Sequence, residues 1–333
     1  MTLTNRQVVL RHPVTGLPAA EDFEIATAPV PEPAAGEILV KHRFIALDPW
    51  QRSAIAGRHS ADQQPLAAGM MPPAETLGEV VKTRHPDFQE GMIVRVAGGW
   101  QEYSLADGAA ATLITERGVP LSLYLGVLGM PGLTAWASME RLARVQRDQT
   151  VLVSAALGPV GSMVGQLAKL RDGRAVGIAG GPEKCARVVD EFGFSQCVDY
   201  RAPGYIDELR AALPNGADIY HDNVGGQMLI DACGVMKDYG TVVLCGLISQ
   251  YNDPALAVDL PMAIPILKRL VMKGLVVYDH SDAEPEFLDT VAPRIADGTI
   301  RYLEDRARGI EATGAQFARL MGGNNLGKTL VEL

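Results

Sequence analysis

Two glycines near the middle of the chain, Gly158 and Gly161, lie between a predicted strand and a predicted helix. The strand is the apolar run Val151–Val153, of the kind that is buried on both faces of a parallel sheet. The helix is predicted from apolar residues along one side, at Val160, Val164, Leu167, Ala168 and Leu170. Glycines in such a turn let the backbone approach a pyrophosphate, and the N–H groups that begin the helix stabilise its charge. The spacing predicts a dinucleotide site. An ordinary tight turn is the alternative, because the pattern is Ala155-x-x-Gly158-x-x-Gly161 rather than the complete G-x-G-x-x-G.

The residues after the next predicted strand indicate which dinucleotide is bound. That strand, Arg174–Ala179, ends roughly 20 residues after the glycines, where an NAD site places an acidic residue on the ribose hydroxyls. Here the chain reads Gly180-Gly-Pro-Glu-Lys184, so no acid ends the strand and a lysine follows it. A cation at this position favours NADP, whose ribose carries an extra phosphate. The alternative interpretation of Lys184 is a solvated helix residue.

Composition excludes several classes of partner. The chain has 333 residues, 47% of them hydrophobic, and a net charge of −9, which is enough for two domains with a large core. The acidic balance and the absence of Lys/Arg runs argue against nucleic acid or an anionic membrane as a partner. No apolar run reaches the roughly 18 residues of a membrane span, and the N-terminus lacks an apolar signal core. We expect a cytoplasmic protein.

The four cysteines have no spacing that suggests a zinc site. They are Cys185, Cys197, Cys233 and Cys245, and none belongs to a C-x-x-C pair. All four fall in the segment that carries the nucleotide-binding pattern. We expect reduced thiols in or near a core.

The chain changes character at about Val127. Before it, short strands between Pro and Gly turns suggest a small, irregular β domain; they are Arg6–Leu10, Glu37–Lys41, Leu77–Val81 and Met92–Val96. After it, strands alternate with helices up to residue 300, the pattern of a doubly wound parallel sheet. The further strands are predicted at Gln196–Tyr200, Asp218–Asn223, Gly240–Cys245 and Lys273–Tyr278, and helices at 182–192, 226–236 and 284–297. The last segment, Arg301–Leu333, ends in a strand that we expect to rejoin the first domain.

This order of domains resembles the medium-chain dehydrogenase/reductase superfamily. Several motifs narrow the resemblance to its zinc-independent group of prostaglandin/leukotriene reductases, alkenal double-bond reductases and curcumin reductases. The motifs are Leu47–Arg52, Gly129–Ala135, Ala155–Gly165, Gly180–Cys185, Asp222–Gly226, Cys245–Asn252 and Asn325–Lys328. They cover nearly the whole chain in the family's order. The resemblance implies a GroES-like substrate domain over 1–126 and 302–333 and a Rossmann NADP-binding domain over 127–301. It also implies reduction of the C=C bond of α,β-unsaturated ketones and aldehydes with NADPH.

The sequence itself argues against a zinc site of the alcohol dehydrogenase kind. Such enzymes take Cys and His ligands from the β domain, but residues 1–126 contain no cysteine. Where a Gly-His-Glu ligand motif would stand, the chain reads Ala74-Glu-Thr-Leu-Gly-Glu79, without histidine. We therefore expect no metal, and hydrogen-bond donors must polarise the substrate carbonyl.

Tyr251 is the predicted catalytic residue. An enone that accepts hydride at its β-carbon develops negative charge on the carbonyl oxygen and then needs a proton at the α-carbon. Tyr251 follows the fifth strand of the sheet, and open sheets of this kind bind ligands beyond the carboxyl ends of their strands. The resemblance gives the matching tyrosine the role of donor. Alternatively, Tyr251 only packs on the cofactor, and the ribose 2′-hydroxyl of the cofactor is a second candidate donor.

The resemblance also assigns residues to the parts of NADP(H). The pyrophosphate would contact Gly158, Pro159, Val160 and Gly161, and the 2′-phosphate would contact Lys184 and Tyr200. The ribose and nicotinamide would contact Asn223, Cys245, Gly246, Leu247, Ile248, Ser249, Tyr251, Met130, Thr134, Val277, Tyr278 and Asn325. Simpler interpretations stay open: turn residues for Asn223 and Asn325, and plain core for Val277 and Met130. His221, inside a predicted strand, is interpreted as a strand histidine with satisfied hydrogen bonds.

The substrate pocket is where this sequence departs from its family. The predicted substrate contacts are Trp50, Tyr251 and Tyr278. Trp50 stands where the family has tyrosine, although packing in the core is an alternative role. Asp279-His280 follows Tyr278 in a loop that varies among relatives. The natural substrate and the stereochemistry are therefore left open.

The first alternative function is an NADPH quinone oxidoreductase on the same scaffold, which should not need Tyr251. The second, from another class, is a nucleotide-binding protein without catalysis. Reduction of a ketone to an alcohol is a third, disfavoured because the sequence shows neither a metal site nor a Ser-Tyr-Lys arrangement. The family also implies a homodimer.

Overall fold

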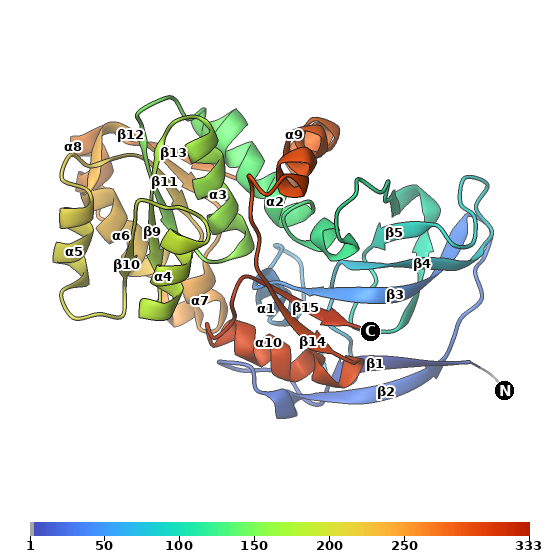
Figure 1. The fold of residues 1–333 in the computed structure, drawn as a ribbon. Coiled ribbons are helices and arrows are strands. Elements are labelled where there is room, and N and C mark those ends of the chain that lie inside the picture. The colour runs from blue at the N-terminus through green and yellow to red at the C-terminus, as the bar shows by residue number, and fades with distance from the viewer. Residues whose placement is uncertain (1–2) are drawn as a thin grey trace. The chain divides into compact units, whose positions relative to one another are not determined.

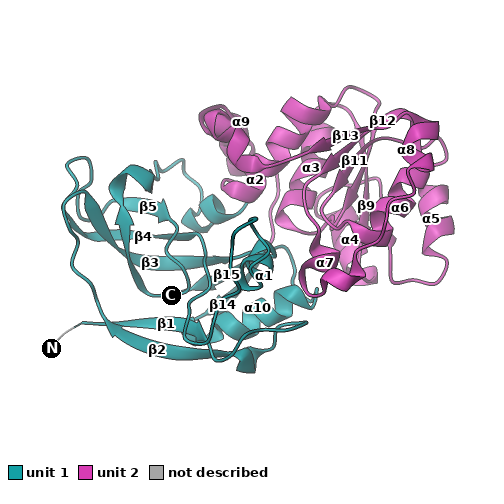
Figure 2. Cartoon of the chain, turned by 180° about the vertical axis from the view of Figure 1, so that it is seen from behind, with its two compact units in different colours: residues 1–126, 304–333 teal, residues 127–303 magenta. Residues whose placement is uncertain are grey.

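The computed structural model describes residues 3–333, and the chain divides into two compact units (Figure 2). Unit 1 comprises Met1–Gly126 and Glu304–Leu333, and unit 2 comprises Val127–Leu303. Unit 1 is rich in β-strands, and unit 2 contains a parallel sheet with helices on both sides (Figure 1). The predicted α/β fold class is confirmed.

Unit 1 contains two sheets. The smaller pairs β1 (Thr4–Leu10) with β2 (Phe23–Pro29). The larger has the order β14-β15-β3-β4-β5-β7, and β6 also pairs with β3. Its strands are β3 (Glu37–Leu47), β4 (Thr76–Thr83), β5 (Ile93–Val96), β6 (Tyr103–Asp107), β7 (Thr112–Leu113), β14 (Glu304–Arg308) and β15 (Lys328–Glu332). Because β15 pairs antiparallel with β3, the last strand of the chain lies in the same sheet as an early one.

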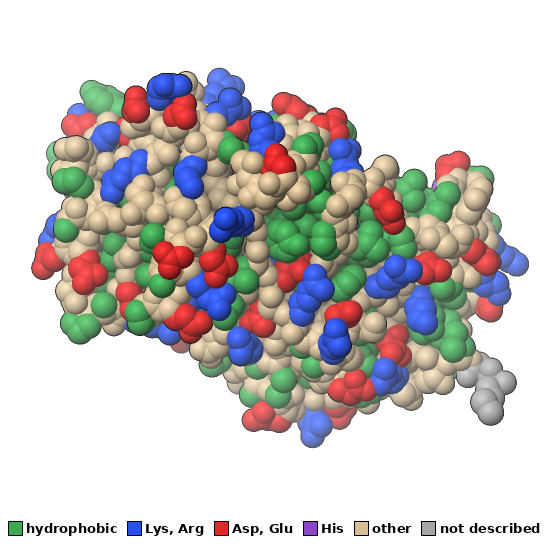
Figure 3. Space-filling view, in the orientation of Figure 1, with side chains coloured by type: hydrophobic (Ala, Val, Ile, Leu, Met, Phe, Trp, Pro, Cys, Tyr) green, Lys and Arg blue, Asp and Glu red, His purple; other side chains and the backbone are tan. Residues whose placement is uncertain are grey.

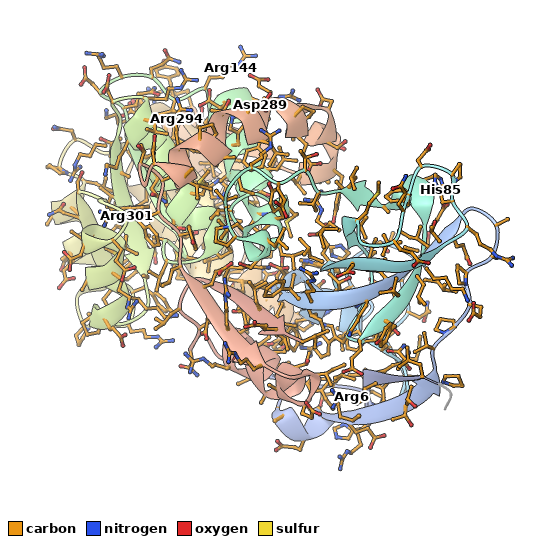
Figure 4. All side chains as sticks on the ribbon, turned by 45° about the vertical axis from the view of Figure 1, so that its right-hand side comes forward. Arg6, His85, Arg144, Asp289, Arg294 and Arg301 are labelled. Atoms are coloured by element: carbon orange, nitrogen blue, oxygen red, sulfur yellow. The ribbon has the colours of Figure 1, made fainter. Side chains whose placement is uncertain are left out.

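The core of unit 1 joins segments that are far apart in the sequence. The rings of Phe23 on β2, Trp100 and Phe317 lie 5.1 to 6.1 Å apart, and Phe317 belongs to helix α10 (Thr313–Met321). Arg6 on β1, labelled in Figure 4, forms ion pairs with Glu102 and Glu311. Through Trp100 and Glu102, the first and last segments of the chain contact the stretch just before β6.

A buried ion pair fixes the turn that leads to α1 (Trp50–Ile55). The Nζ of Lys328 on β15 lies 2.5 Å from Oδ1 of Asp48, and both side chains are almost completely buried. Gln51 adds a hydrogen bond from Nε2 to the carbonyl of Ala46, at 2.9 Å. Together these contacts hold the start of the helix, and with it Trp50, against the end of β3. The remaining helical turns of unit 1 are η1 (Ala20–Asp22), η2 (Gly108–Ala110), η3 (Leu121–Leu125) and η7 (Ile310–Ala312).

Unit 2 contains a six-stranded parallel sheet. Its order is β10-β9-β8-β11-β12-β13, which in chain order is 3-2-1-4-5-6, the order of dinucleotide-binding folds. The strands are β8 (Thr150–Ser154), β9 (Arg174–Ala179), β10 (Gln196–Asp199), β11 (Ala217–Asp222), β12 (Met236–Leu244) and β13 (Val271–Gly274). Strands β8 and β11 are buried over most of their length, as the apolar sequence predicts.

One predicted strand is wrong in its position. The strand predicted at Lys273–Tyr278 is found at Val271–Gly274, and Val277–Ala283 forms a 3₁₀ turn, η6. The reason is that, within residues 3–333, β13 pairs only with β12, which ends at Leu244. Leu244 pairs with Gly274 and accepts a hydrogen bond from the Leu275 N–H, so β12 offers no partner to the residues after Leu275. Val276 is 58% exposed, which shows that its apolar side chain is not part of a sheet core.

The helices of unit 2 follow the predicted alternation. They are α2 (Met130–Trp136), α3 (Pro159–Leu170), α4 (Pro182–Asp190), α5 (Tyr205–Ala212), α6 (Gly226–Gly234), α7 (Ile248–Tyr251), α8 (Ala263–Lys268) and α9 (Glu284–Ala296), with a π-helical segment η4 (Ala137–Ala143) and a short turn η5 (Pro254–Leu256). Most of α3 is buried, and Phe194 packs directly on its Gly165. Leu170 is the exception to the predicted apolar side, since it is 40% exposed at the end of the helix.

Charged side chains of both signs are interspersed on the face shown in Figure 3. Within residues 3–333, no helix combines the length and the apolar character needed to cross a bilayer.

Candidate functional site

The carboxyl ends of β8 and β11 mark the point where the strand order of the parallel sheet reverses. β9 and β10 lie on one side of this point, and β12 and β13 lie on the other. In open α/β sheets, ligands bind outside the strand ends at such a point. The residues that follow β8, β9, β10, β11 and β12 in unit 2 therefore form the candidate site.

A buried carboxylate organises this point. Asp222, at the end of β11, is completely buried and accepts hydrogen bonds from the hydroxyls of Ser154 and Tyr220, at 3.2 and 2.7 Å. It also accepts from the backbone N–H groups of Val224 and Gly225, both at 3.0 Å. Four donors offset the cost of burying a charge. The result is a turn after β11 that is fixed to the end of β8.

The glycine turn after β8 is shaped by close backbone packing. A Cβ atom on Gly161 would lie 2.4 Å from the carbonyl oxygen of Ala155 and 2.9 Å from the Cα of Ala156, so only glycine fits there. Ala155 itself has φ of 49°, the left-handed conformation that glycine adopts more easily. These contacts bring the start of α3 directly against the end of β8.

The start of α3 suits a bound phosphate. Gly158 is the N-cap residue, Pro159 opens the helix, and within the described residues no side chain caps it. The backbone N–H groups of Val160 and Gly161 are therefore the donors that face an incoming anion. The turn suits a pyrophosphate because these N–H groups have no side-chain cap at the start of the helix.

A second group of residues lies at the ends of β9 and β10. A Cβ atom on Gly180 would be 2.9 Å from Nε of Arg201 and 3.1 Å from the hydroxyl of Tyr200, so both side chains lie over this glycine. The Arg201 guanidinium is 5.7 Å from the centre of the Tyr200 ring. Lys184 lies in the first turn of α4, which begins immediately after Gly181. Tyr200 and Arg201 over Gly180, with Lys184 in the adjoining helical turn, are residue types suited to the 2′-phosphate of NADP.

Asp199 holds this group in place. Its Oδ1 accepts hydrogen bonds from the backbone N–H of Gly181, at 2.8 Å, and of Arg201, at 2.9 Å. The carboxylate therefore joins the end of β10 to the turn before α4. It fixes the backbone that carries Lys184, Tyr200 and Arg201.

The segment from Cys245 to Tyr251 is hydrogen-bonded along the turn after β11. The N–H groups of Cys245 and Gly246 both donate to the carbonyl of Asp222, at 2.8 and 3.1 Å. The Ser249 hydroxyl donates to the carbonyl of Val224, at 2.7 Å. The structure therefore brings the predicted residues 245–251 and Asn223 together.

Tyr251 ends the short helix α7 and is partly buried. Its hydroxyl accepts a hydrogen bond from the N–H of Leu247, at 3.4 Å. Desolvation by burial raises the pKa of the phenol above its usual value of 10, although the Leu247 N–H opposes this shift. Tyr251 is therefore protonated at neutral pH and able to donate a proton.

His221 and Asn223 form a buried chain of hydrogen bonds. The ring nitrogens of His221 lie 2.8 Å from the Ser138 hydroxyl and 3.2 Å from Oδ1 of Asn223, and the Asn223 amide donates to the carbonyl of Ser154 at 2.8 Å. Burial lowers the pKa of His221 to about 4, so it is neutral. The interpretation of His221 as a satisfied strand histidine is confirmed. The role of Asn223 toward the cofactor stays a prediction.

The remaining predicted residues of unit 2 lie on α2 and η6, which pack against each other. Thr134 is buried, and its hydroxyl donates to the carbonyl of Met130 at 2.7 Å. Val277 is half-buried, whereas Tyr278 is 64% exposed.

Two predicted residues lie in unit 1. Trp50 begins α1, half-buried, with its ring 5.0 Å from that of His59. Asn325 lies in the loop between α10 and β15, and its amide donates to the carbonyl of Gly327 at 2.9 Å. Their roles toward cofactor and substrate stay predictions.

Sequence reasoning missed Asp222, Ser154 and Arg201 as site residues. A signal existed for two of them: Asp222 ends an apolar strand before the Asn-Val-Gly-Gly turn, and Arg201 follows Tyr200 directly. Among the residues that the structure describes, no three His, Cys, Asp or Glu side chains gather as a metal site.

Two family models match the chain. Residues 6–114 match the N-terminal domain of oxidoreductase, and residues 159–293 match a model described as zinc-binding dehydrogenase. The second match covers the nucleotide-binding segment, not residues 1–126, from which zinc alcohol dehydrogenases of this architecture take their Cys and His ligands.

Named relatives match over almost the whole chain. An NADP(+)-dependent 2-alkenal reductase of Nicotiana tabacum is 36% identical, with 99% of this chain and 97% of the relative covered. An NADPH-dependent curcumin reductase of Escherichia coli is 32% identical, with 99% of this chain and 97% of the relative covered. The crystal structure of CurA from Vibrio vulnificus in complex with NADPH superimposes with a TM-score of 0.92, at 34% identity and 98% coverage of both chains.

Proposed function

This chain belongs to the medium-chain dehydrogenase/reductase superfamily, in the group of alkenal, curcumin and prostaglandin reductases, and from that premise we propose that it reduces the C=C bond of α,β-unsaturated ketones and aldehydes. It is an oxidoreductase, and its cofactor is NADP(H). The observation that carries the proposal is the position of Tyr251, a protonated phenol beyond the carboxyl end of β12.

The cofactor is held by three parts of unit 2. The N–H groups at the start of α3 bind the pyrophosphate, and Gly161 lets this helix start pack against the backbone of Ala155 and Ala156. Lys184, Tyr200 and Arg201 bind the 2′-phosphate. The segment Cys245–Tyr251 contacts the nicotinamide end. Bound NADPH supplies the hydride.

In the reaction, the protein stabilises the negative charge that develops on the substrate and supplies a proton. As the β-carbon of the enone accepts hydride, the carbonyl oxygen becomes anionic, and the Tyr251 hydroxyl stabilises it with a hydrogen bond. The α-carbon then takes a proton, which Tyr251 supplies. The raised pKa suits this role, because the phenol stays protonated until the substrate becomes basic enough to take the proton. The roles of Trp50 and Tyr278 as substrate contacts stay predictions.

The test is NADPH consumption with a panel of enones and alkenals. We expect turnover on several of them and a KM for NADH well above that for NADPH. No turnover on any enone would contradict the proposal, and turnover on quinones alone would favour the quinone reductase instead.

A pair of variants tests the donor. Tyr251→Phe should lower kcat on enones by roughly a hundredfold, the contribution typical of a positioned acid. The residual rate comes from the second donor, the ribose 2′-hydroxyl. Tyr239→Phe is the control, because it removes the same hydroxyl from a tyrosine that is 71% exposed on β12. Equal kcat values in the two variants would contradict the assignment.

A cytoplasmic location and a homodimeric state stay predictions. Light scattering coupled to gel filtration tests the second, and a monomer at micromolar concentration would contradict it.

A further inference from the structure

Two cysteines face each other between helix α4 and the sheet of unit 2. The Sγ atoms of Cys185 on α4 and Cys197 on β10 are 2.9 Å apart. Neither belongs to a C-x-x-C motif, and the reductase chemistry proposed above uses neither. Both residues are partly exposed, whereas Cys233 is completely buried in the core.

The surrounding backbone makes the close approach of the sulfurs possible. Cys197 pairs with Gly177 on β9, and a Cβ atom there would lie 3.3 Å from the Cys197 sulfur and 2.8 Å from the Ala156 side chain. Glycine therefore leaves space for the sulfur beneath α4, which packs on both β9 and β10. The sulfurs of a disulfide are about 2.05 Å apart, so bond formation needs them to close by less than about 1 Å.

We propose that Cys185 and Cys197 form a dithiol that hydroperoxides oxidise reversibly to a disulfide. Cys185 is the attacking thiol. Its thiolate attacks one peroxide oxygen, forming an S–O bond while the O–O bond breaks and the leaving oxygen takes a proton to give an alcohol or water. Cys197 then attacks the sulfur of the Cys185 sulfenic acid, an S–S bond forms, the S–O bond breaks, and water leaves with the Cys197 proton. The peroxide is reduced by the two electrons that the thiols lose.

The order of attack follows from the environments of the two thiols. The hydrogen bond from Cys197 lowers the pKa of Cys185, whereas the same contact and burial raise the pKa of Cys197. The thiolate is the reactive form, so the partly exposed Cys185 reacts first and Cys197 resolves. The negative charges of Asp199 and Glu208 partly oppose this lowering of the Cys185 pKa.

The disulfide would connect the two segments that carry the candidate 2′-phosphate site. Lys184 directly precedes Cys185, and Tyr200 lies three residues after Cys197. Oxidation therefore changes the KM for NADPH, and dithiothreitol restores it. This second statement rests on the proposed cofactor site, but the dithiol chemistry does not.

Thiol counting and peptide mapping test the dithiol independently of any enone assay. The reduced full-length protein is treated with hydrogen peroxide and its thiols are then counted under denaturing conditions. We expect the four thiols of the chain to fall to two and trypsin to release Cys185–Arg187 joined to Val188–Arg201. The control Cys233→Ala should lose two thiols as well, whereas Cys185→Ser and Cys197→Ser should give no linked peptide.

Three outcomes would overturn the proposal: four thiols that survive the peroxide, a disulfide that involves Cys233 or Cys245, or Cys185 that is oxidised to a sulfinic acid without linkage. For the coupling to the cofactor, the KM for NADPH is measured before oxidation, after it, and after dithiothreitol. An unchanged KM in fully linked protein would overturn the coupling, and a peroxide effect that persists in Cys185→Ser would do the same.

Discussion

Replacing Gly161 by alanine should destabilise unit 2 and weaken NADPH binding. The added Cβ atom would lie 2.4 Å from the carbonyl oxygen of Ala155 and 2.9 Å from the Cα of Ala156. Both neighbours are backbone atoms, so no side-chain rotation relieves the overlap. The start of α3 must move away from the end of β8, and its N–H groups move with it.

The size of the effect follows from two opposing contributions. An extra methyl group in a packed site costs about 1–3 kcal/mol. Alanine in a helix is more favourable than glycine by about 0.5–1 kcal/mol, which offsets part of this cost. We therefore expect a net loss of about 1–2 kcal/mol in the free energy of unfolding. The KM for NADPH should rise because the phosphate-binding N–H groups are displaced.

Gly158→Ala is the matched control. Gly158 has an ordinary φ of −67°, and its Cβ atom would approach only the Ala155 carbonyl oxygen, at 3.2 Å. Alanine is a poorer N-cap than glycine, so a loss of about 0.5–1 kcal/mol is expected, smaller than that of Gly161→Ala. The assay is urea unfolding followed by circular dichroism, with the KM for NADPH measured for Gly161→Ala. If the two variants unfold at the same urea concentration, the packing argument for Gly161 is refuted.

Three further predictions concern the 2′-phosphate, the buried carboxylate and pH. Arg201→Ala should raise the KM for NADPH roughly tenfold, which corresponds to the free energy of one charged hydrogen bond, and should leave the KM for NADH unchanged. Equal changes in the two KM values would contradict this. Asp222→Asn should lower the free energy of unfolding by about 2–3 kcal/mol in urea titrations, because an amide N–H then faces the Gly225 N–H; wild-type stability would count against it. His42 and His221 are buried with pKa values of about 4, against 6.5 when unfolded, so the unfolded chain binds protons first as pH falls. Stability should therefore drop by roughly 3 kcal/mol per histidine between pH 6.5 and 4, and urea midpoints that stay constant over this range would disprove it.

The sequence was sufficient for the fold class because its signals are local. Apolar runs such as Val151–Val153 and the turn around Gly158 belong to single elements, and their alternation indicates a parallel sheet. The strand predicted at Lys273–Tyr278 was misplaced because its true end depends on the length of β12, which is not encoded in the strand itself. Leu170 likewise continues the apolar spacing of α3 but lies beyond the part of the helix that is covered.

The candidate site was less accessible to sequence reasoning. The residues gathered after β11 and β12 were assigned through family resemblance, and their roles are still predictions. The hydrogen bonds that fix them join Asp222 to Ser154, 68 positions away, and no local pattern reports such a contact. Arg201 was missed for a related reason, since only the fold places its side chain over Gly180 together with Tyr200.

The central claim is that hydride reaches the β-carbon of an enone. It is tested most directly by incubating the protein with a simple enone and NADPH deuterated at the transferable position of the nicotinamide, with the product analysed by NMR. We expect a saturated ketone with one deuterium at the β-carbon and a solvent proton at the α-carbon. An allylic alcohol with deuterium on the carbinol carbon, or no deuterium in the product, would contradict it.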